Sequence, residues 1–299
     1  MEVPLSMAIL VLGATGMLGH KLMQVLSGRF ATTGTVRGST ARYAGHPVMG
    51  SMRLLGDVQA ESFDSVVRAF AIIKPTVVIN CVGIIKQLPA AKTPLPSITI
   101  NALFPHRLAQ LCQTAGAALI QISTDCVFSG RKGNYAEDDS SDAEDLYGRT
   151  KLLGEVTGPG CLTLRTSIIG RELQNRSGLI EWFIAQRSGR ATGYSKAIYS
   201  GLTTRALAEL IGDILEQRPD LSGLWHVSSD PISKYELLGL VNQALHLGVS
   251  LTRDETLVCD RSLDSARFRK AMGYQPPRWP DMVTQLAGDP THYEQLRDV

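Results

Sequence analysis

Short apolar segments recur along the chain and set its predicted architecture. The clearest occupy residues 8–12, 76–80, 118–122, 161–164 and 224–227. They lack the alternation of polar and apolar residues that marks a half-exposed strand, as is usual for strands covered on both faces of a parallel sheet. Amphipathic helices are predicted between them, for example from Leu18 to Leu26 and from Leu207 to Leu215. This alternation predicts right-handed βαβ units, and so an α/β fold with a doubly wound parallel sheet.

The alternation weakens after about residue 170. Helices such as Ser233 to Leu247 are predicted there, with weaker strand candidates. We expect one domain from residues 1–171 and 200–228, because the second of these segments reads as a helix and a strand that return to the main sheet. A smaller, discontinuous C-terminal domain is expected from residues 172–199 and 229–299, on the substrate side.

The composition narrows the class of protein. The chain has 299 residues, 44% of them hydrophobic, and its 30 Lys and Arg against 28 Asp and Glu give a net charge of +2. Such a chain can bury a large core. A near-neutral charge lacks the basic footprint of proteins that bind nucleic acid or anionic membranes. We therefore expect no nucleic acid and no membrane as a partner, but a small molecule, and homodimer formation stays open.

The cysteines and the N-terminus indicate a cytoplasmic location. The 5 cysteines are scattered, without a C-x-x-C pair or a histidine at zinc-ligand spacing, so reduced thiols and no metal site are expected. Glu2 stands where a signal peptide carries basic residues, and no apolar run reaches the roughly 20 residues of a membrane span. Met7 is a sensible alternative start if residues 1–6 are a tail.

A glycine-rich turn follows the first predicted strand and opens the first helix. In the run from Gly13 to Gly19, glycines recur at every third position. Glycine allows positive φ in the tight turn, close approach of the backbone to a diphosphate, and close packing of helix on strand. The helix N-terminus adds free N–H groups and the positive end of its dipole. This context predicts a dinucleotide site on a Rossmann-type sheet.

An absent acid indicates which dinucleotide binds. NAD sites usually carry Asp or Glu about 20 residues after the glycines, to accept from the ribose 2′-hydroxyl. Between Val3 and Gly56 the chain has no acid, and Arg37 stands at the expected distance, followed by Ser39 and Arg42. A guanidinium fork suits a 2′-phosphate, so NADP(H) is favoured over NAD. The alternative is an ordinary surface arginine. Asp57, the first acid after Glu2, is placed to accept from the adenine amino group.

Tyr147 and Lys151 stand at i and i+4 on one predicted helix face. The preceding strand ends in Ser123-Thr124-Asp125, at the carboxyl edge where open α/β sheets bind ligands. A lysine ammonium about 4 Å from a phenol, at an effective dielectric near 20, is worth about 4 kcal/mol, or roughly three pKa units. We expect Lys151 to lower the pKa of Tyr147, and Thr124 to hold a carbonyl oxygen that Tyr147 protonates. An incidental Tyr and Lys on a surface helix is the alternative.

These motifs, in this order, resemble the extended short-chain dehydrogenase/reductases. The runs from Ser123 to Gly130 and from Leu146 to Glu155 look most like the dTDP-4-dehydrorhamnose reductase family. The resemblance implies NADPH reduction of the 4-keto group of a nucleotide-linked deoxysugar, with Thr124, Tyr147 and Lys151 as the catalytic set. The cofactor contacts predicted from the residues and the resemblance together are Gly13, Thr15, Gly16, Met17, Leu18, Gly19, Arg37, Asp57, Val58, Asn80, Cys81, Val82, Gly83, Asn101, Tyr147 and Lys151.

The chain departs from the family pattern on the substrate side. The family usually has Tyr where this chain has Cys126, an aromatic where it has Ile168, and a different run where it has Gly83 to Gln87. Some members bind magnesium through an acid where this chain has Lys21. The departures leave the hexose and the nucleotide base open. The predicted substrate contacts, with cations for a diphosphate, are Ile85, Lys86, Thr124, Asp125, Cys126, Ile168, Arg205 and Arg261.

Two other functions stay open on the same fold. Epimerases and 4,6-dehydratases act on related sugar nucleotides, but dehydratases place an acid where this chain has Cys126, and the missing ribose acid argues against tightly held NAD. A non-catalytic NADP-binding regulatory protein is the third reading. The run from Glu137 to Asp145 holds six acids and no base. It reads as a solvated loop whose last acids favour a helix N-terminus, or as a mobile rim over the site.

Overall fold

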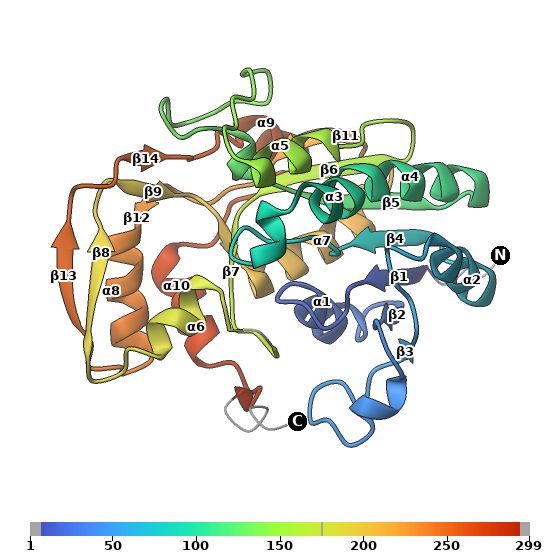
Figure 1. Ribbon diagram of the computed structural model, residues 1–299, viewed down its shortest axis with the longest axis horizontal. Helices are drawn as coiled ribbons and strands as arrows, with labels where there is room; N and C mark the ends of the chain where they lie inside the picture. Colours follow the sequence, from blue (N-terminus) through green and yellow to red (C-terminus); the bar gives the residue numbers. More distant parts are fainter. Residues whose placement is uncertain (1–6, 175, 294–299) are drawn as a thin grey trace.

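The computed structural model describes residues 7–174 and 176–293. A seven-stranded sheet in the order β11-β6-β5-β4-β1-β2-β3 forms its centre, and every pairing within it is parallel (Figure 1). The strands are β1 Ala8–Leu12, β2 Ala31–Thr35, β3 Leu54–Leu55, β4 Val77–Asn80, β5 Ala118–Thr124, β6 Cys161–Thr166 and β11 Gly223–His226. The order reverses between β1 and β4, as in a doubly wound Rossmann-type sheet, so the predicted fold class is confirmed.

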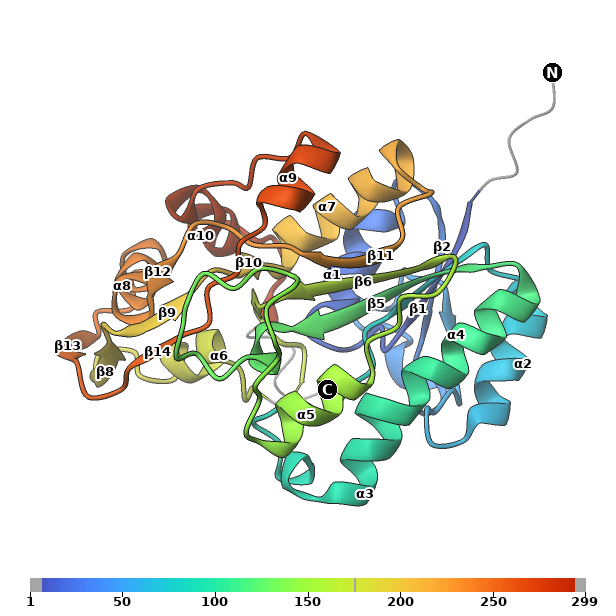
Figure 2. The same ribbon diagram turned by 90° about the horizontal axis from the view of Figure 1, so that it is seen from above.

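Helices cover both faces of this sheet (Figure 2). On one face lie α1 Gly19–Leu26, α7 Thr204–Gln217 and α9 Ala266–Met272. On the other lie α2 Phe63–Ile73, α4 Phe104–Ala115 and α5 Leu146–Leu153. The short α3 Pro94–Ser97 and a π-helical turn at Ile98–Leu103 lead into α4. Because both faces are covered, β1, β4 and β6 are almost wholly buried, which is why these segments lack polar alternation.

The rest of the chain forms small sheets and helices beside the central sheet (Figure 1). The strand pairings are β7 Ile168–Ile169 with β10 Leu202–Thr203, β8 Arg190–Tyr194 with β13 Ser250–Asp254, and β9 Ala197–Tyr199 with β12 Ile232–Ser233 and β14 Cys259–Asp260. The helices are α6 Leu179–Ile184, α8 Lys234–Ala244 and α10 Trp279–Ala287. Ser233 begins α8 with a capping box, in which its side chain and that of Glu236 bond each other's backbone N–H.

Residues 1–6, which precede the alternative start at Met7, lie outside the described residues. Among the helices that the structure describes, none combines the length and apolar character that a membrane crossing requires.

Candidate active site

The carboxyl ends of the neighbouring parallel strands β1, β4, β5 and β6 lie at one edge of the sheet, and most of the predicted site residues stand at or just after these ends. Leu12 at the end of β1 pairs with Asn80 at the end of β4, and Thr124 at the end of β5 pairs with Thr166 of β6. The glycine-rich turn, the loop after Asn80 and the catalytic candidates therefore lie on adjacent strands. This is the edge at which open α/β sheets bind ligands.

The three glycines of the turn have different structural roles. Gly13 has a φ of +81°, which favours glycine. A Cβ on Gly19 would overlap the Gly13 carbonyl oxygen, so glycine lets α1 pack directly on the end of β1. Gly16 is exposed, and its N–H donates to the Gly13 carbonyl at 3.1 Å. Among the described residues no side chain caps the N-terminus of α1, so its N–H groups remain available to an anion.

Arg37 lies beyond the end of β2 in a position suited to a phosphate. Its side chain is exposed, and no described residue pairs with its guanidinium. The backbone N–H of Asp57 donates to Gly38 at 3.0 Å, and that of Val58 donates to Val36 at 3.1 Å. The structure therefore brings Arg37, Asp57 and Val58 together beside the glycine-rich turn.

The loop after β4 is held by two amide side chains. Asn80 donates to Gln121 Oε1 at 2.8 Å and accepts from the Val82 N–H at 3.0 Å. Asn101, on the π-helical turn, accepts from the Ile84 N–H at 2.9 Å and donates to the Ile84 carbonyl at 3.0 Å. Both amides are thus engaged with the protein itself. Their observed role is to fix the loop that carries Cys81, Val82 and Gly83 at the site.

The catalytic candidates come from β5 and α5. Asp145 caps α5 by accepting from the Gly148 N–H at 2.7 Å. A Cβ on Gly148 would overlap the Cys126 carbonyl oxygen, so α5 lies directly against the loop after Thr124. This close approach brings the Thr124 hydroxyl near enough to the Tyr147 phenol to oppose the rise of its pKa. Lys151 is 9% exposed, and its Nζ donates to the Ile122 carbonyl at 2.7 Å.

The expected effect of Lys151 on Tyr147 is not found. Burial raises the pKa of the Tyr147 phenol, and the neighbouring Cys126 acts in the same direction. Burial also lowers the pKa of Lys151 to about 8, against the charge of Glu155. The prediction of a lowered phenol pKa is therefore wrong for this arrangement, because Lys151 points to the Ile122 carbonyl and desolvation outweighs its charge. Burial likewise raises the pKa of Cys126 to about 12, which disfavours a nucleophilic thiolate.

The predicted substrate contacts separate into two groups. Arg261, which follows β14, donates from Nε to the Phe128 carbonyl at 2.7 Å, and its charge acts on Asp125, whose pKa is raised by burial. Lys86 bonds Asp145 Oδ2 at 2.6 Å, at an exposed position near the N-terminus of α5. These contacts place Arg261 and Lys86 around the loop that carries Asp125 and Cys126. Ile85 and Ile168 are partly buried at the strand ends.

Arg205 belongs to the other group. On α7 its Nε donates to Glu209 Oε1 at 2.9 Å, an i,i+4 pair along one helix. In the described part of the chain it makes no contact with Thr124, Tyr147 or Lys151. The structure therefore does not bring Arg205 to the catalytic set, and its charge is already paired.

The acidic run is an anchored loop. Glu137 accepts from the His226 N–H at 3.0 Å, and Asp142 accepts from Ser129. Asp139 pairs with Lys132, and Glu144 pairs with Arg131. Together with the Asp145 cap, these contacts favour the reading of a solvated loop that ends at a helix N-terminus.

A buried ion pair between Arg165 and Glu155 lies beside β5 and was assigned no role from the sequence. Arg165 binds both carboxylate oxygens of Glu155 at 2.8 Å, and Ser123 donates to Glu155 at 2.6 Å. Glu155 follows Lys151 by four residues, and this spacing was the available signal. Its charge opposes the loss of a proton from Lys151.

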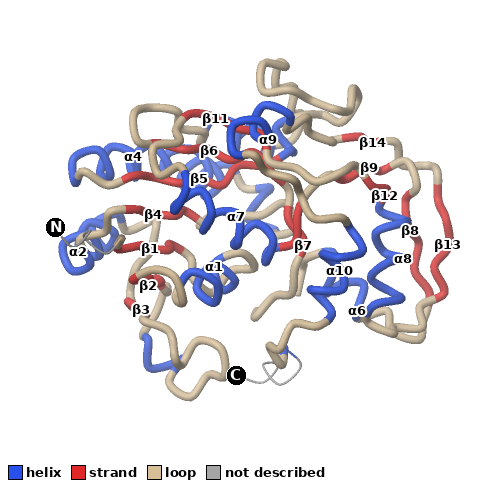
Figure 3. Tube along the Cα trace, turned by 180° about the vertical axis from the view of Figure 1, so that it is seen from behind, coloured by secondary structure: helices blue, strands red, loops and turns tan. Residues whose placement is uncertain are grey.

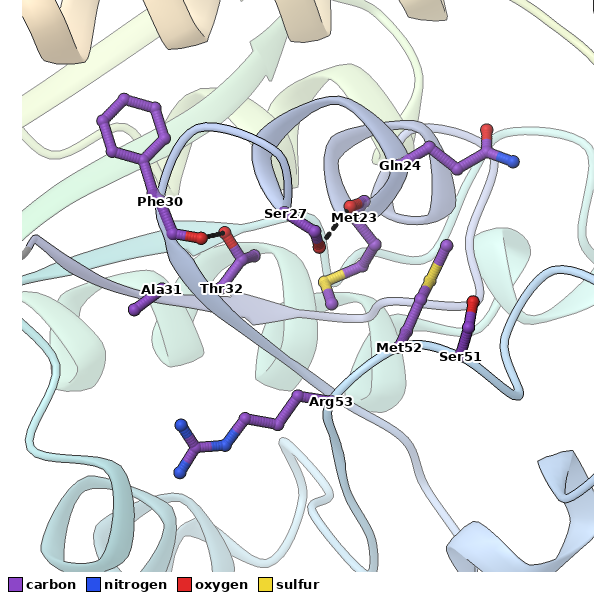
Figure 4. Close-up of a pocket in the computed structure, with 9 residues that line it drawn as sticks. All are labelled: Met23, Gln24, Ser27, Phe30, Ala31, Thr32, Ser51, Met52 and Arg53. Carbon is purple, nitrogen blue, oxygen red and sulfur yellow. Dashed lines mark hydrogen bonds between the residues drawn. The ribbon is translucent and has the colours of Figure 1, made fainter.

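A surface cavity of about 490 Å³ lies elsewhere, with Met23, Phe30 and Arg53 among its lining residues (Figure 4). It borders the amino end of β2, whereas the candidate site lies at the carboxyl ends of the strands. We therefore do not assign it to the same site.

Comparisons with known proteins identify relatives. Over 147 residues the chain is 35% identical to a dTDP-4-dehydrorhamnose reductase of Streptomyces griseus, covering 49% of this chain but only 43% of that protein. Over 253 residues it is 26% identical to methionine adenosyltransferase 2 subunit beta of Danio rerio, covering 80% and 74% of the two chains. A dTDP-4-dehydrorhamnose reductase of Bacillus anthracis in complex with NADP has the same fold, with a TM-score of 0.77, 19% identity, and coverage of 94% and 99%.

A family model described as the RmlD substrate binding domain matches residues 7–288. This range contains the whole central sheet and every predicted site residue. The chain therefore belongs to the RmlD substrate binding domain family, which confirms the resemblance to the dTDP-4-dehydrorhamnose reductases that its motifs indicate.

Proposed function

We propose that this protein is an NADPH-dependent reductase of the 4-keto group of a nucleotide-linked 6-deoxyhexose, in the cytoplasmic supply of deoxysugars for polysaccharides. The observation that carries the proposal is that the Thr124 hydroxyl lies close enough to the Tyr147 phenol to influence its pKa, at the carboxyl edge of the sheet. The glycine-rich turn and Lys151 lie on neighbouring elements of the same edge. The names of the similar reductases support the substrate class.

The residues at the cofactor side fit NADP(H). The uncapped N-terminus of α1 and the exposed Gly16 form a surface that a backbone-bound diphosphate can approach. The guanidinium of Arg37, which pairs with no residue that the structure describes, suits the 2′-phosphate that distinguishes NADP(H) from NAD(H). Bound NADPH supplies the hydride for the carbonyl carbon. Lys151, whose Nζ donates to the Ile122 carbonyl, would bond the nicotinamide ribose.

The chain itself supplies the proton and the orientation. Thr124 and Tyr147 would both donate toward the substrate carbonyl oxygen, for which the Thr124 hydroxyl would turn from Asp125 Oδ1, its acceptor at 3.2 Å. As hydride reaches the carbon, the phenol of Tyr147 gives its proton to that oxygen, and a hydroxyl results. Arg261 would hold the sugar nucleotide from the side of Asp125, with Lys86 at the rim. We assign residues 172–199 and 229–299 to this substrate side, apart from α9, which lies on the central sheet, and residues 289–293, which contact α1.

The test is oxidation of NADPH against a panel of dTDP-, UDP- and GDP-4-keto-6-deoxyhexoses. We expect turnover with at least one member, and Tyr147→Phe should lower kcat by about 100-fold or more while NADPH still binds. Tyr274→Phe is the matched control, because among the described residues the buried Tyr274 hydroxyl has no hydrogen-bond partner and lies outside the site. Wild-type turnover in Tyr147→Phe, or no response to the whole panel, would overturn the proposal.

A regulatory protein is the second candidate. The alignment with methionine adenosyltransferase 2 subunit beta covers 80% of this chain, more than the 49% covered by the reductase of S. griseus. NADPH binding without turnover of any sugar nucleotide would favour it. Turnover without added NADPH would instead indicate an epimerase or dehydratase that retains its dinucleotide.

A further inference from the structure

The segment that follows α10 returns to the helix that begins at the glycine-rich turn. The chain leaves α10 as a loop and runs toward the side of the central sheet where α1 lies, away from β8 and β13 (Figure 3). Asp289 forms an ion pair with Lys21 of α1, in which the two side chains are only 9% and 5% exposed. Gln24 donates to Thr291 Oγ1 at 2.9 Å. Residues 289–293, here called the C-terminal strap, are thereby fastened along α1.

The strap reaches the glycine-rich turn through one histidine. His20 is fully buried, and its Nδ1 lies 2.8 Å from the Gly16 carbonyl oxygen. Its Nε2 lies 2.9 Å from the hydroxyl of Tyr293. A carbonyl oxygen only accepts, so Nδ1 carries the proton of the ring. Burial lowers the pKa of His20 to about 4, so the ring is neutral near pH 7 and Nε2 is free to accept. The hydroxyl of Tyr293 is therefore the donor.

The hydrogen bonds between Tyr293, His20 and Gly16 all donate in one direction. Tyr293 has one hydroxyl proton, and its other acceptor, Asp289 Oδ2, lies at 3.5 Å, farther than His20. The proton on Nδ1 then points at Gly16. The order of donation is Tyr293 to His20 to the Gly16 carbonyl, and each donor in it is buried.

The bonds at the Gly16 carbonyl determine where the next N–H points. The same oxygen also accepts from the backbone N–H of His20 at 3.1 Å. A trans peptide is planar, with its C=O and N–H pointing in opposite directions. Two donors that hold the Gly16 carbonyl toward the interior of α1 therefore aim the Met17 N–H away from it, at the open end of the helix. This is the end at which a helix binds an anion.

We propose that Tyr293 is a positioning residue for the dinucleotide diphosphate, acting through His20 on the peptide between Gly16 and Met17. The identity of the ligand rests on the proposed function, but the link between the strap and the turn does not. The effect concerns a diphosphate shared by NADPH and NADH. It should therefore change the affinity for both equally, unlike any residue that reads the 2′-phosphate.

The experiment compares Tyr293→Phe with Thr291→Val. The first removes the donor to His20, and the second removes the contact of the same strap with Gln24 but leaves the relay intact. Hydrogen–deuterium exchange of residues 13–20, measured without ligand, reports on the turn itself. We expect faster exchange in Tyr293→Phe alone. We also expect Kd for NADPH and for NADH to rise together about five- to tenfold, as for one lost buried hydrogen bond, with kcat unchanged.

Each outcome decides one question. Unchanged exchange in Tyr293→Phe, or the same increase in Thr291→Val, would overturn the relay, because the strap would then act only as packing. Faster exchange with unchanged Kd would overturn the effect on the diphosphate. Faster exchange in a protein whose wild type binds neither dinucleotide would refute the proposed function and leave the relay standing.

Discussion

Gly19→Ala tests the packing of α1 on the end of β1. A Cβ at Gly19 would overlap the carbonyl oxygen of Gly13 and lie 2.9 Å from its carbonyl carbon, closer than real Cβ atoms come. The obstacle is backbone at the end of a central strand, so relief requires a shift of the helix. Overpacking costs about 1–3 kcal/mol, and this backbone clash belongs at the upper end. The better helix propensity of alanine offsets about 1 kcal/mol.

The net expectation for Gly19→Ala is a loss of about 2 kcal/mol. At an unfolding entropy of about 2 cal/mol/K per residue, this corresponds to about 3 °C in the Tm of a cooperatively unfolding chain of this length. Two nearby glycines, at which a Cβ would meet no such clash, serve as controls. A Cβ on the exposed Gly16 would meet only the Gly13 carbonyl oxygen, at 3.4 Å, and one on Gly28, just after α1, would meet nothing within 4 Å.

The assay measures thermal unfolding and NADPH binding on the three alanine variants. We expect Gly19→Ala to lose stability, and Gly16→Ala to keep its Tm while Kd for NADPH rises on the order of tenfold, because the backbone there meets the diphosphate. Gly28→Ala should change neither quantity. Equal Tm losses at Gly16 and Gly19, or an unchanged Tm in Gly19→Ala, would refute the steric argument.

Three further changes test the charges around the site. Because burial lowers the pKa of Lys151 to about 8, kcat/KM should fall above about pH 8 as the ammonium loses its proton. Lys151→Arg keeps its charge and should remove this fall. A fall in kcat/KM that persists in Lys151→Arg would belong to another group. Asp289→Asn leaves the Lys21 ammonium buried without its carboxylate partner, so the free energy of unfolding, measured with denaturant, should fall by about 3–5 kcal/mol. A fall of less than about 1 kcal/mol would contradict a desolvated ion pair. Arg37→Ala should raise KM for NADPH about tenfold and leave KM for NADH unchanged, and equal changes for both would remove Arg37 from the 2′-phosphate.

The strands of the central sheet were predictable where burial requires a run of apolar residues. Residues 8–12 form β1 as expected, and 118–122 lie within β5. The strand β2 has no such apolar run, because its sequence is ATTGT. Three of its threonines are buried, and Gly34 packs on Met23, where a Cβ would lie 2.9 Å from the sulfur. Only its place between the glycine-rich turn and Arg37 indicates that a strand belongs there.

Sequence spacing predicted which residues share the candidate site, but not their electrostatics. The interval between Tyr147 and Lys151 gives a shared helix face, whereas the direction of the lysine side chain depends on the Ile122 carbonyl of another element. Contacts across long stretches of sequence were equally invisible. Arg261 reaches the Phe128 carbonyl over 133 positions, and Tyr293 reaches His20 over 273. Such pairings depend on tertiary packing and leave no local periodicity.

The raised pKa of Tyr147 suits a proton donor better than a base. In the proposed reduction the carbonyl oxygen would gain negative charge as hydride arrives, so the group beside it must hold a proton to give. Burial and Cys126 keep that proton on the phenol at neutral pH. Once the phenol has given it, the phenolate is buried, while the ammonium of Lys151 is turned to the Ile122 carbonyl. The reverse oxidation must begin from this costly phenolate. If the chain has the proposed activity, the same arrangement should favour reduction near neutrality and confine oxidation to alkaline pH.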